Sequence, residues 1–241
     1  MRSLTDRVID LNADVGEGAG EEPLYSIITS ANVACGGHAG DADSMHEAVR
    51  LARRHGVAIG AHPSYPDRAR FGRATCDLAP AELAAAVAAQ VMALSIVARR
   101  SGAELAHVKP HGALYNDAAR DGIVAGAIAE AVATISAQLV LVGLSGSVAL
   151  DAWRERGFTV AAEGFADRAY DAAGALVPRS QAGALITDPL AASAQAVRLA
   201  REGRCDTICV HSDTPGAASI ARAVRRALEA DGFTLRAAHS G

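Results

Sequence analysis

The sequence is poor in lysine, in aromatic residues and in paired cysteines. Of the 23 Lys and Arg residues in this 241-residue chain only Lys109 is a lysine, and aromatic residues make up 4%. The formal net charge is −4 and the basic residues are scattered, so nothing indicates a nucleic-acid or polyanion surface. No C-x-x-C pair occurs among Cys35, Cys76, Cys205 and Cys209, so we expect the reduced thiols of a cytoplasmic protein.

Long apolar runs and several nucleotide or nucleophile motifs are also missing. No stretch approaches the roughly 20 continuous apolar residues of a membrane helix, and residues 1–18 lack the apolar core of a secretory peptide. A P-loop is excluded because the sole lysine precedes a proline. "GEGAGEE" fails the G-x-G-x-x-G pattern, and "GLSGS" lacks the G-x-S-x-G elbow. We therefore expect no membrane span, and any nucleotide must be bound by other means or by a partner.

Short apolar runs alternate with longer helical patterns along the whole chain. The expected strands are Val8 to Asn12, Ile27 to Cys35, Val57 to Ala61, Leu105 to Lys109, Leu139 to Gly143, Thr159 to Glu163 and Thr207 to Val210. The expected helices cover 41–55, 80–101, 117–135, 145–156, 189–202 and 215–231. This alternation predicts an α/β fold with a parallel sheet, and polar loops after nearly every strand favour a barrel over a doubly wound sheet. Without a linker or composition break, we expect one domain over residues 1–241.

Polar side chains gather at the ends of the expected strands. Asp10 and Asn12 share one face of the first strand, and Asp14 and Glu17 follow it. Later strand ends carry His38, Asp41, His62, Asp67, Lys109, His111, Tyr115, Asn116, Glu163, Asp167, Arg168, Asp171, His211 and Asp213. Because parallel barrel strands end on one face, we expect these groups to share a catalytic or binding pocket.

Each of these residues also has an ordinary structural interpretation. Asp41 and Asp213 could cap helices, Cys35 could fill the core, and Arg168 and Arg179 could be solvated. Five of the eight histidines, however, lie at or next to strand ends, namely His38, His62, His107, His111 and His211. Scattered structural histidines would not be expected to share this position, so the pocket is the favoured interpretation.

Carboxylates, imidazoles and one ammonium in a pocket can perform acid–base chemistry or hold a divalent metal ion. Asp14, His38 and His62 are the metal candidates. Their spacing is not diagnostic, because the ligands would come from different strands. The sequence therefore leaves the metal open.

Several segments together resemble the LamB/YcsF family. They are "IDLNADVGEG", "SANVACGGHAGD", "GVAIGAHPSYPD", "FGR", "HVKPHGALYN", "FADRAYD", "LVPRS" and "DTICVHSDTPGA", in order over about residues 8 to 231. The resemblance implies a distorted (β/α)7-8 barrel of the glycoside hydrolase/deacetylase type. It also implies 5-oxoprolinase activity, the ATP-dependent hydrolysis of the lactam 5-oxo-L-proline to L-glutamate, carried out with partner subunits B and C. The chain departs from the usual family pattern at Gly37, Ser64 and Ser212, and in shortened segments at 18–26 and before the last strand.

The resemblance suggests roles for the strand-end residues, which we state as hypotheses. ATP would phosphorylate the lactam oxygen, and water would attack the activated carbon. Candidates to place that water are Asp10, Asp14, His38 and His62. Lys109 would hold the substrate carboxylate or offset charge on the oxygen, with its pKa lowered if desolvated.

The remaining candidates would bind the substrate or protonate it. Arg168 or Arg179 would grip a carboxylate or phosphate, and His111 or His211 would protonate the leaving nitrogen. The other expected substrate-binding residues are Asn12, Glu17, Tyr115, Asn116, Glu163 and Asp213. Two other functions stay open, an independent metal-dependent amide or sugar deacetylase and a non-catalytic substrate-binding subunit. The sequence also leaves open a homo-oligomer.

Overall fold

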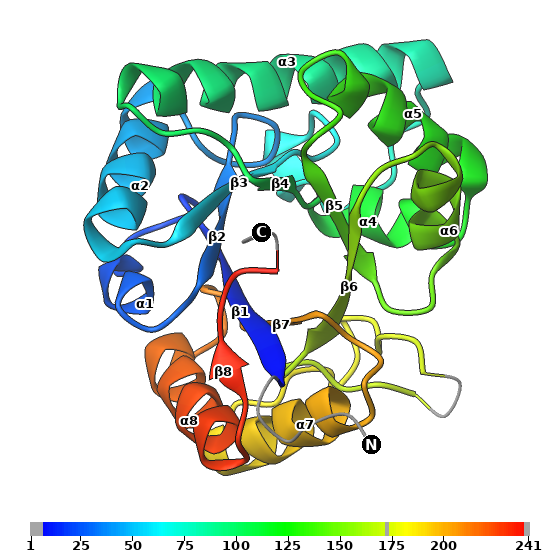
Figure 1. Cartoon of the computed structure of the whole chain (residues 1–241). Helices are drawn as coiled ribbons and strands as arrows, with labels where there is room; N and C mark the ends of the chain where they lie inside the picture. Colours follow the sequence, from blue (N-terminus) through cyan, green and yellow to red (C-terminus); the bar gives the residue numbers. More distant parts are fainter. Residues whose placement is uncertain (1–6, 172–173, 239–241) are drawn as a thin grey trace.

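The computed structural model describes residues 7–171 and 174–238, and their strands form a closed parallel barrel (Figure 1). The strands are β1 (Val8–Val15), β2 (Ser30–Ala34), β3 (Ala58–His62), β4 (His107–Val108), β5 (Val140–Leu144), β6 (Val160–Phe165), β7 (Thr207–Cys209) and β8 (Thr234–Leu235). Each of β2 to β6 pairs with the next strand along the chain, and β1 closes the ring by pairing with both β7 and β2. β8 adds to the start of β1. The predicted α/β barrel is confirmed.

Helices surround the barrel on its outer side (Figure 1). They are α1 (Glu22–Tyr25), α2 (Ala42–His55), α3 (Pro80–Arg100), α4 (Gly112–Ala118), α5 (Gly122–Ala133), α6 (Val148–Glu155), α7 (Pro189–Arg201) and α8 (Ala217–Ala230), with a 3-10 turn η1 (Arg68–Arg70). The helix ends follow local chemistry. Asp41 caps α2 by accepting the Ser44 N–H, and Gly56 ends it in the left-handed conformation at φ 66°.

Several boundaries differ from the sequence-based expectation, and three of the differences have a clear local cause. β1 runs on to Val15, because its second half pairs with β2 after its first half has paired with β7. β2 begins only at Ser30, because Ile27 and Ile28 close a turn onto Leu24 after α1. The segment expected as one helix at 117–135 contains the end of α4 and all of α5, because Asp121 caps α5, which begins at Gly122, by accepting the Ile123 N–H. The short elements α1, η1 and β8 were not anticipated.

The barrel has an apolar outer layer and a polar interior. Along β1, Ile9, Leu11, Ala13 and Val15 belong to the hydrophobic core beneath the helices. The alternate residues Asp10, Asn12 and Asp14 are also buried, at 3%, 1% and 3% exposure. Because strand side chains alternate between faces, this second set points into the barrel. Burying so many polar groups requires that they satisfy one another, and this requirement shapes the site.

α3 is long and apolar enough to cross a membrane by length and composition alone. The sequence-based expectation of no such stretch did not anticipate it. One such helix is weak evidence for a span, because buried core helices pass the same test. In the structure α3 lies across the barrel beside α5 (Figure 1), and its residues Val87, Val91 and Leu94 are fully buried.

Candidate active site

The deepest polar layer of the barrel is built around Asp10. Its carboxylate accepts hydrogen bonds from Thr29 Oγ1 at 2.5 Å, Ser30 Oγ at 2.8 Å and Thr207 Oγ1 at 2.7 Å. Burial raises the pKa of Asp10 to about 6, against the opposing effect of the three hydroxyl donors. Asp10 therefore ties β1, β2 and β7 together below the pocket rather than lining it.

Lys109 lies at the centre of the next layer. Its Nζ is 2.9 Å from Asp14 Oδ1, 2.8 Å from Glu163 Oε1 and 3.1 Å from Cys209 Sγ. The side chain comes from the end of β4 and is 2% exposed. Burial alone would lower the pKa of Lys109, but the charges of Asp14 and Glu163 raise it well above its usual value. The expectation of a lowered pKa is wrong for this reason, and Lys109 stays an ammonium.

A network of amides fixes the two carboxylates around that ammonium. Asn12 Nδ2 donates to Glu163 Oε1 at 3.0 Å, and Asn32 Nδ2 donates to Asp14 Oδ1 at 2.9 Å. Asn32 Oδ1 lies 2.7 Å from His107 Nε2. Sequence reasoning missed Asn32, although Ser30 and Asn32 alternate with apolar residues in "SANVA" and so indicate a polar inner face.

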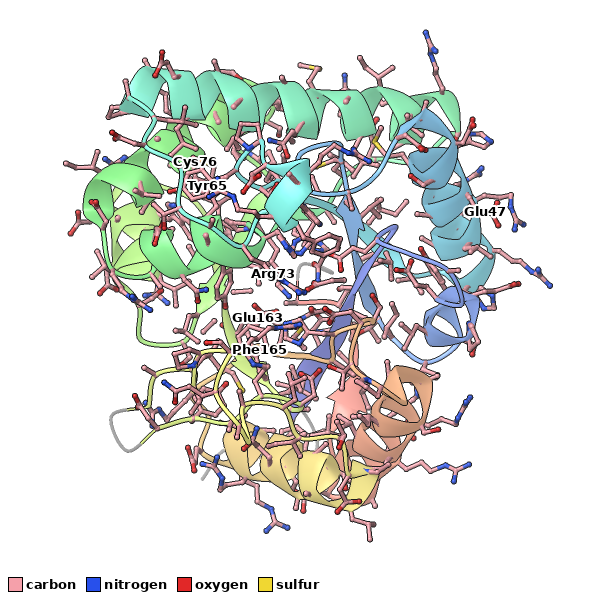
Figure 2. The ribbon with its side chains drawn as sticks, turned by 180° about the vertical axis from the view of Figure 1, so that it is seen from behind. Glu47, Tyr65, Arg73, Cys76, Glu163 and Phe165 are labelled. Carbon is pink, nitrogen blue, oxygen red and sulfur yellow. The ribbon has the colours of Figure 1, made fainter. Side chains whose placement is uncertain are left out.

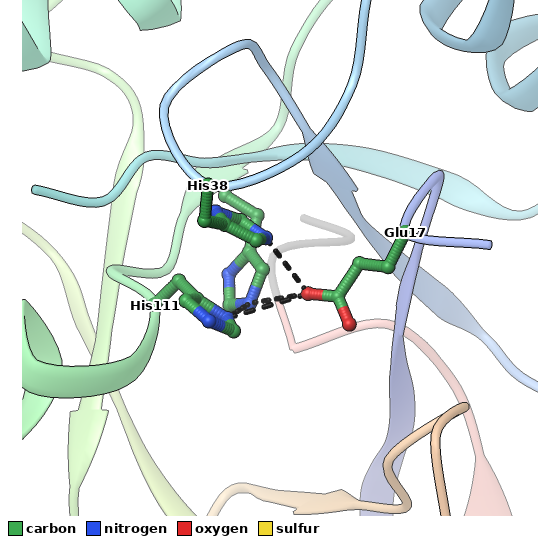
Figure 3. A group of neighbouring side chains, drawn as sticks. Glu17, His38 and His111 are labelled. Atoms are coloured by element: carbon green, nitrogen blue, oxygen red, sulfur yellow. Dashed lines mark hydrogen bonds and ion pairs between the residues drawn. The ribbon is translucent and has the colours of Figure 1, made fainter. Parts of the chain in front are cut away.

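One carboxylate and three imidazoles form a second cluster beside Lys109 (Figure 3). Glu17 Oε1 lies 2.9 Å from His38 Nε2, 3.3 Å from His111 Nδ1 and 3.8 Å from His62 Nε2. His111 Nδ1 is 3.0 Å from His62 Nε2, and the rings of His38 and His111 stack with centroids 3.6 Å apart. Four residues expected from sequence at three strand ends and one glycine loop therefore meet in one place. All four carry metal-ligating atoms within 4.8 Å of one another.

Glycines explain how His38 reaches this cluster after β2. Gly36 adopts φ 106°, which L side chains rarely allow. Gly37 has an ordinary φ, but a Cβ there would overlap Gln90 Oε1 and Ser64 Oγ. The first glycine turns the chain, and the second lets it pass close to its neighbours.

The loop that carries Glu17 is held by a residue that sequence reasoning missed. The Glu21 carboxylate accepts the backbone N–H groups of Gly16, Glu17 and Gly18 at 2.6, 3.1 and 3.0 Å. Its place four residues after Glu17 in "GEGAGEE" could have suggested a loop clamp. Glu21 therefore acts as a positioning residue for Glu17.

His211 and Asp167 form a separate pair on the other side of the pocket. Asp167 accepts from His211 Nδ1 at 2.9 Å, from the His211 backbone N–H at 3.0 Å and from Thr214 Oγ1 at 2.6 Å. Burial would raise the pKa of Asp167, but His211 and the Thr214 hydroxyl lower it overall. With Nδ1 engaged, His211 presents Nε2 toward Asp14, 4.0 Å from its Oδ2. Asp167 follows β6 and orients this ring.

A cavity of about 450 Å³ opens over these groups. Among the residues that line it are Asp14, His62, Lys109, His111, His211, Tyr115, Asn116, Phe165, Arg73, Arg120, Arg168 and Arg179. Figure 2 shows Arg73, Glu163 and Phe165 toward the middle of the barrel and Glu47 outside. A second cavity of about 490 Å³ lies at the opposite strand ends, near Leu105, Val140 and Thr159. None of the expected site residues lines that second cavity.

Arginines form the cavity rim. Arg73 and Arg179 both bind Asp213 Oδ2, at 2.5 and 2.8 Å, so Asp213 joins two loops instead of capping α8. Arg168 is 7% exposed, and it donates to the Val177 carbonyl at 2.7 Å. Its Nε has no hydrogen-bond partner among residues 7–171 and 174–238. Sequence reasoning named Arg168 and Arg179 but missed Arg73 and Arg120.

Of the residues expected in the pocket, therefore, some form the lining and others support it. Asp14, His62, Lys109, His111, Tyr115, Asn116, Arg168, Arg179 and His211 line the cavity. Glu17, Glu163 and Asp213 form ion pairs with residues of that lining. His38 stacks on His111, and Asn12 Oδ1 accepts from Lys109 Nζ at 3.4 Å. Asp10 lies deepest and contacts the hydroxyls of the lowest layer.

Comparison with known proteins gives relatives that match nearly the whole chain. A protein from Chloroflexus aggregans, named as the A subunit of 5-oxoprolinase, is 52% identical over 95% of this chain and 98% of its own length. A protein of the same name from Streptomyces avermitilis is 48% identical, over 95% of this chain and 99% of its own.

Solved structures also include a relative that matches nearly the whole chain. The lactam utilization protein from Thermus thermophilus superposes with a TM-score of 0.88 at 45% identity, covering 95% of this chain and 99% of that one. A family 4 carbohydrate esterase from Streptomyces lividans shares the fold, with a TM-score of 0.52 at 13% identity, covering 95% of this chain and 91% of that one. The LamB/YcsF family model matches residues 9–240, and the chain belongs to the LamB/YcsF family.

Proposed function

We propose that this chain acts as the A subunit of a 5-oxoprolinase, in whose complex the cyclic amide 5-oxo-L-proline is hydrolysed to L-glutamate. The observation that carries the proposal is the cavity over Lys109, in a chain about half identical to proteins of that name. The reaction breaks the lactam C–N bond, adds the oxygen of water to the carbonyl carbon and leaves a proton on the nitrogen. Each of these events needs a group that the cavity offers.

The cavity rim suits the negative end of this substrate. 5-Oxoproline is small and carries one carboxylate, and the rim presents Arg73, Arg168 and Arg179. Among the described residues, Arg168 Nε has no hydrogen-bond partner, so its N–H is available to donate to a ligand. A guanidinium can bind a carboxylate with two parallel hydrogen bonds. We assign the substrate carboxylate to this side.

The cavity floor suits the reacting amide. Lys109 is a fixed ammonium between two carboxylates, so it can offset charge that develops on the carbonyl oxygen but is poorly placed to act as a base. His211 faces the cavity, with Nδ1 held by Asp167, so its Nε2 can take a proton from water or give one to the leaving nitrogen. Asp14 lies between them.

We assign ATP use to the assembled complex. The chain lacks a P-loop and the dinucleotide-binding glycine pattern. ATP would phosphorylate the lactam oxygen with release of ADP, and water would add to the activated carbon. The C–N bond would then break to give an amine and an acyl phosphate, and a second water would release phosphate and L-glutamate. Partner subunits B and C would supply the nucleotide site, and a cytoplasmic location would supply ATP.

Reconstitution with candidate B and C subunits tests the proposal. We expect glutamate release from 5-oxoproline only with ATP and all three chains. Glutamate release by this chain alone without ATP, or no release by the complex, would contradict it. Amide or sugar deacetylation by the isolated chain would instead support the deacetylase alternative.

Substitution of Lys109 tests the chemistry within that complex. Lys109→Met removes the cation, so we expect turnover to fall on the order of 10²-fold or more, the usual cost of losing one stabilising donor. His55→Ala, on the exposed end of α2, is the control and should keep wild-type turnover. Wild-type turnover by Lys109→Met would remove this residue from the chemistry. If pocket variants lose only affinity in calorimetry, the chain is a binding subunit.

A further inference from the structure

Two imidazole nitrogens in the pocket, His62 Nε2 and His111 Nδ1, face each other 3.0 Å apart. His62 Nδ1 lies 2.7 Å from the Lys109 carbonyl oxygen, and His111 Nε2 lies 3.0 Å from the Phe71 carbonyl oxygen. A carbonyl only accepts, so both of these ring nitrogens carry hydrogen. In the neutral rings the other two nitrogens, His62 Nε2 and His111 Nδ1, are bare lone pairs, yet they stand 3.0 Å apart.

The carboxylate of Glu17 adds a third acceptor to the same point. Its Oε1 lies 3.3 Å from the bare Nδ1 of His111 and 3.8 Å from the bare Nε2 of His62. Its side chain is 6% exposed, so bulk water does not screen these contacts. Buried acceptors that converge in this way repel one another unless a cation lies between them.

We propose that Glu17, His62 and His111 bind one divalent ion of the zinc type, with a fourth position left open. The ring of His38 stacks parallel to that of His111, so these two rings cannot both direct a lone pair at one ion. His38 Nε2 instead lies 2.9 Å from Glu17 Oε1 and helps to hold that carboxylate. Tetrahedral zinc with ligand bonds of about 2.0–2.1 Å requires its ligand atoms to be roughly 3.3 Å apart. The three separations between the ligand atoms of Glu17, His62 and His111 are 3.0, 3.3 and 3.8 Å. Imidazole donors suit zinc and its transition-metal neighbours rather than calcium or magnesium.

The surroundings of the cluster support a metal rather than a chance grouping. Metal-bound histidines usually donate their outer N–H to a carbonyl, as His62 and His111 do. The carbonyl for His111 comes from Phe71, which holds φ 54°, an uncommon conformation for a bulky residue. Glu21 clamps the loop of Glu17. Phe71 and Glu21 therefore each aim a ligand inward before any ion arrives.

This ligand set differs from the sequence-based one in its carboxylate and in one histidine. The sequence predicts Asp14 with His38 and His62, and Asp14 Oδ2 is 3.4 Å from His62 Nε2. Its Oδ1, however, is taken by Lys109 and Asn32. Glu17 and His111 complete the set instead, and the site stands whether or not the chain hydrolyses a lactam.

Metal binding to the isolated, tag-free chain tests the site without any activity assay. After chelator treatment and dialysis, we expect Zn²⁺ to bind one to one in calorimetry with a sub-micromolar Kd. Co²⁺ should give the intense visible absorption of a four-coordinate ion. Glu17→Gln and His111→Ala should each weaken Zn²⁺ binding at least tenfold, with folding checked by circular dichroism.

Asp14→Asn and His211→Ala are the matched controls, because both residues line the same cavity but lie outside the set. Both should bind Zn²⁺ one to one within a few-fold of wild type. The proposal is overturned if the wild-type chain binds Zn²⁺ no more tightly than the double variant His62→Ala/His111→Ala, as would follow if the rings share a proton instead. It is also overturned if Asp14→Asn abolishes binding while Glu17→Gln leaves it unchanged.

Discussion

At the scale of one residue, Lys109 is held as an ammonium by Asp14 of β1 and Glu163 of β6, with Nζ–O distances of 2.9 and 2.8 Å. The only lysine of the chain, followed by proline and histidine, could be recognised as special. Its protonation state could not, because one of its two carboxylate partners, Glu163, comes from β6 on another part of the barrel. Which side chains meet across a barrel depends on strand stagger, which the sequence does not display.

Glu21 gives a prediction at the same scale. Glu21→Gln leaves one carbonyl oxygen for three backbone N–H groups and turns an NH2 group toward a donor, so the loop over 16–18 should loosen. Hydrogen exchange at Gly16, Glu17 and Gly18 should speed up about tenfold, since a hydrogen bond to a charged group contributes about 1.5–3 kcal/mol.

The neighbouring Glu22→Gln is the matched control, because Glu22 is exposed in α1. Its exchange at residues 16–18 should equal that of wild type. Unchanged exchange in Glu21→Gln would show that the loop is held by something else.

At the scale of elements, the connection between β2 and α2 depends on contacts with residues from two other parts of the chain. The pair of glycines before His38 predicts a sharp turn or a close approach, and both occur. The sequence could not assign them, because the atoms that crowd Gly37 belong to Ser64 after β3 and Gln90 in α3. The hydrophobic periods of helices and strands locate each element in the sequence. Contacts between elements, however, determine which residue types fit at a given position.

This crowding makes Gly37 and Ser64 a coupled pair. Gly37→Ala would overlap Ser64 Oγ and Gln90 Oε1, and overpacking of this kind costs about 1–3 kcal/mol in the free energy of unfolding. Adding Ser64→Gly removes one of the two obstacles and should recover part of that loss. Urea denaturation of the two single variants and the double variant measures the coupling.

Ala19, exposed in the Glu17 loop, offers a comparison for the background effect of one surface change: Ala19→Ser should leave the unfolding midpoint nearly unchanged. Strict additivity of Gly37→Ala and Ser64→Gly would mean that the two positions do not touch in solution.

At the scale of the whole molecule, the order of strands and helices is enough to predict the barrel. Convergence of the strand-end residues follows from parallel topology, so most pocket residues could be named in advance. The depth of each residue in the barrel could not be predicted, because β1 presents Asp10, Asn12 and Asp14 on one face. Only the stagger of β1 against β7 and β2 shows that Asp10 lies lowest. The proposed role of Glu17 as a metal ligand could not be predicted either, because Glu17 lies on a loop whose path the strand register does not give.

Asp10 links global stability to pH. Its folded pKa of about 6 exceeds the usual 3.8, so the folded state binds this proton more tightly. The resulting stabilisation is complete below about pH 4 and is lost as pH rises through about 6. Asp10→Asn removes this titration, so its unfolding free energy should improve relative to wild type by on the order of 3 kcal/mol between pH 4 and 7.

Chemical denaturation at a series of pH values measures this difference. The hydroxyls of Thr29, Ser30 and Thr207 and the charge of Glu163 surround the group in both cases, so the comparison isolates residue 10. Parallel stability curves for the two proteins would show that the pKa of Asp10 is the same in the folded and unfolded states.

The burial of the one lysine has a practical consequence. An acylating reagent that seeks ε-amines finds Lys109 at 2% exposure and engaged by two carboxylates, so the native barrel should resist modification there. Unfolding frees the amine at once. A mass shift on the peptide that contains Lys109 would thus count opened molecules one by one, and the chain carries its own single-site reporter of barrel opening.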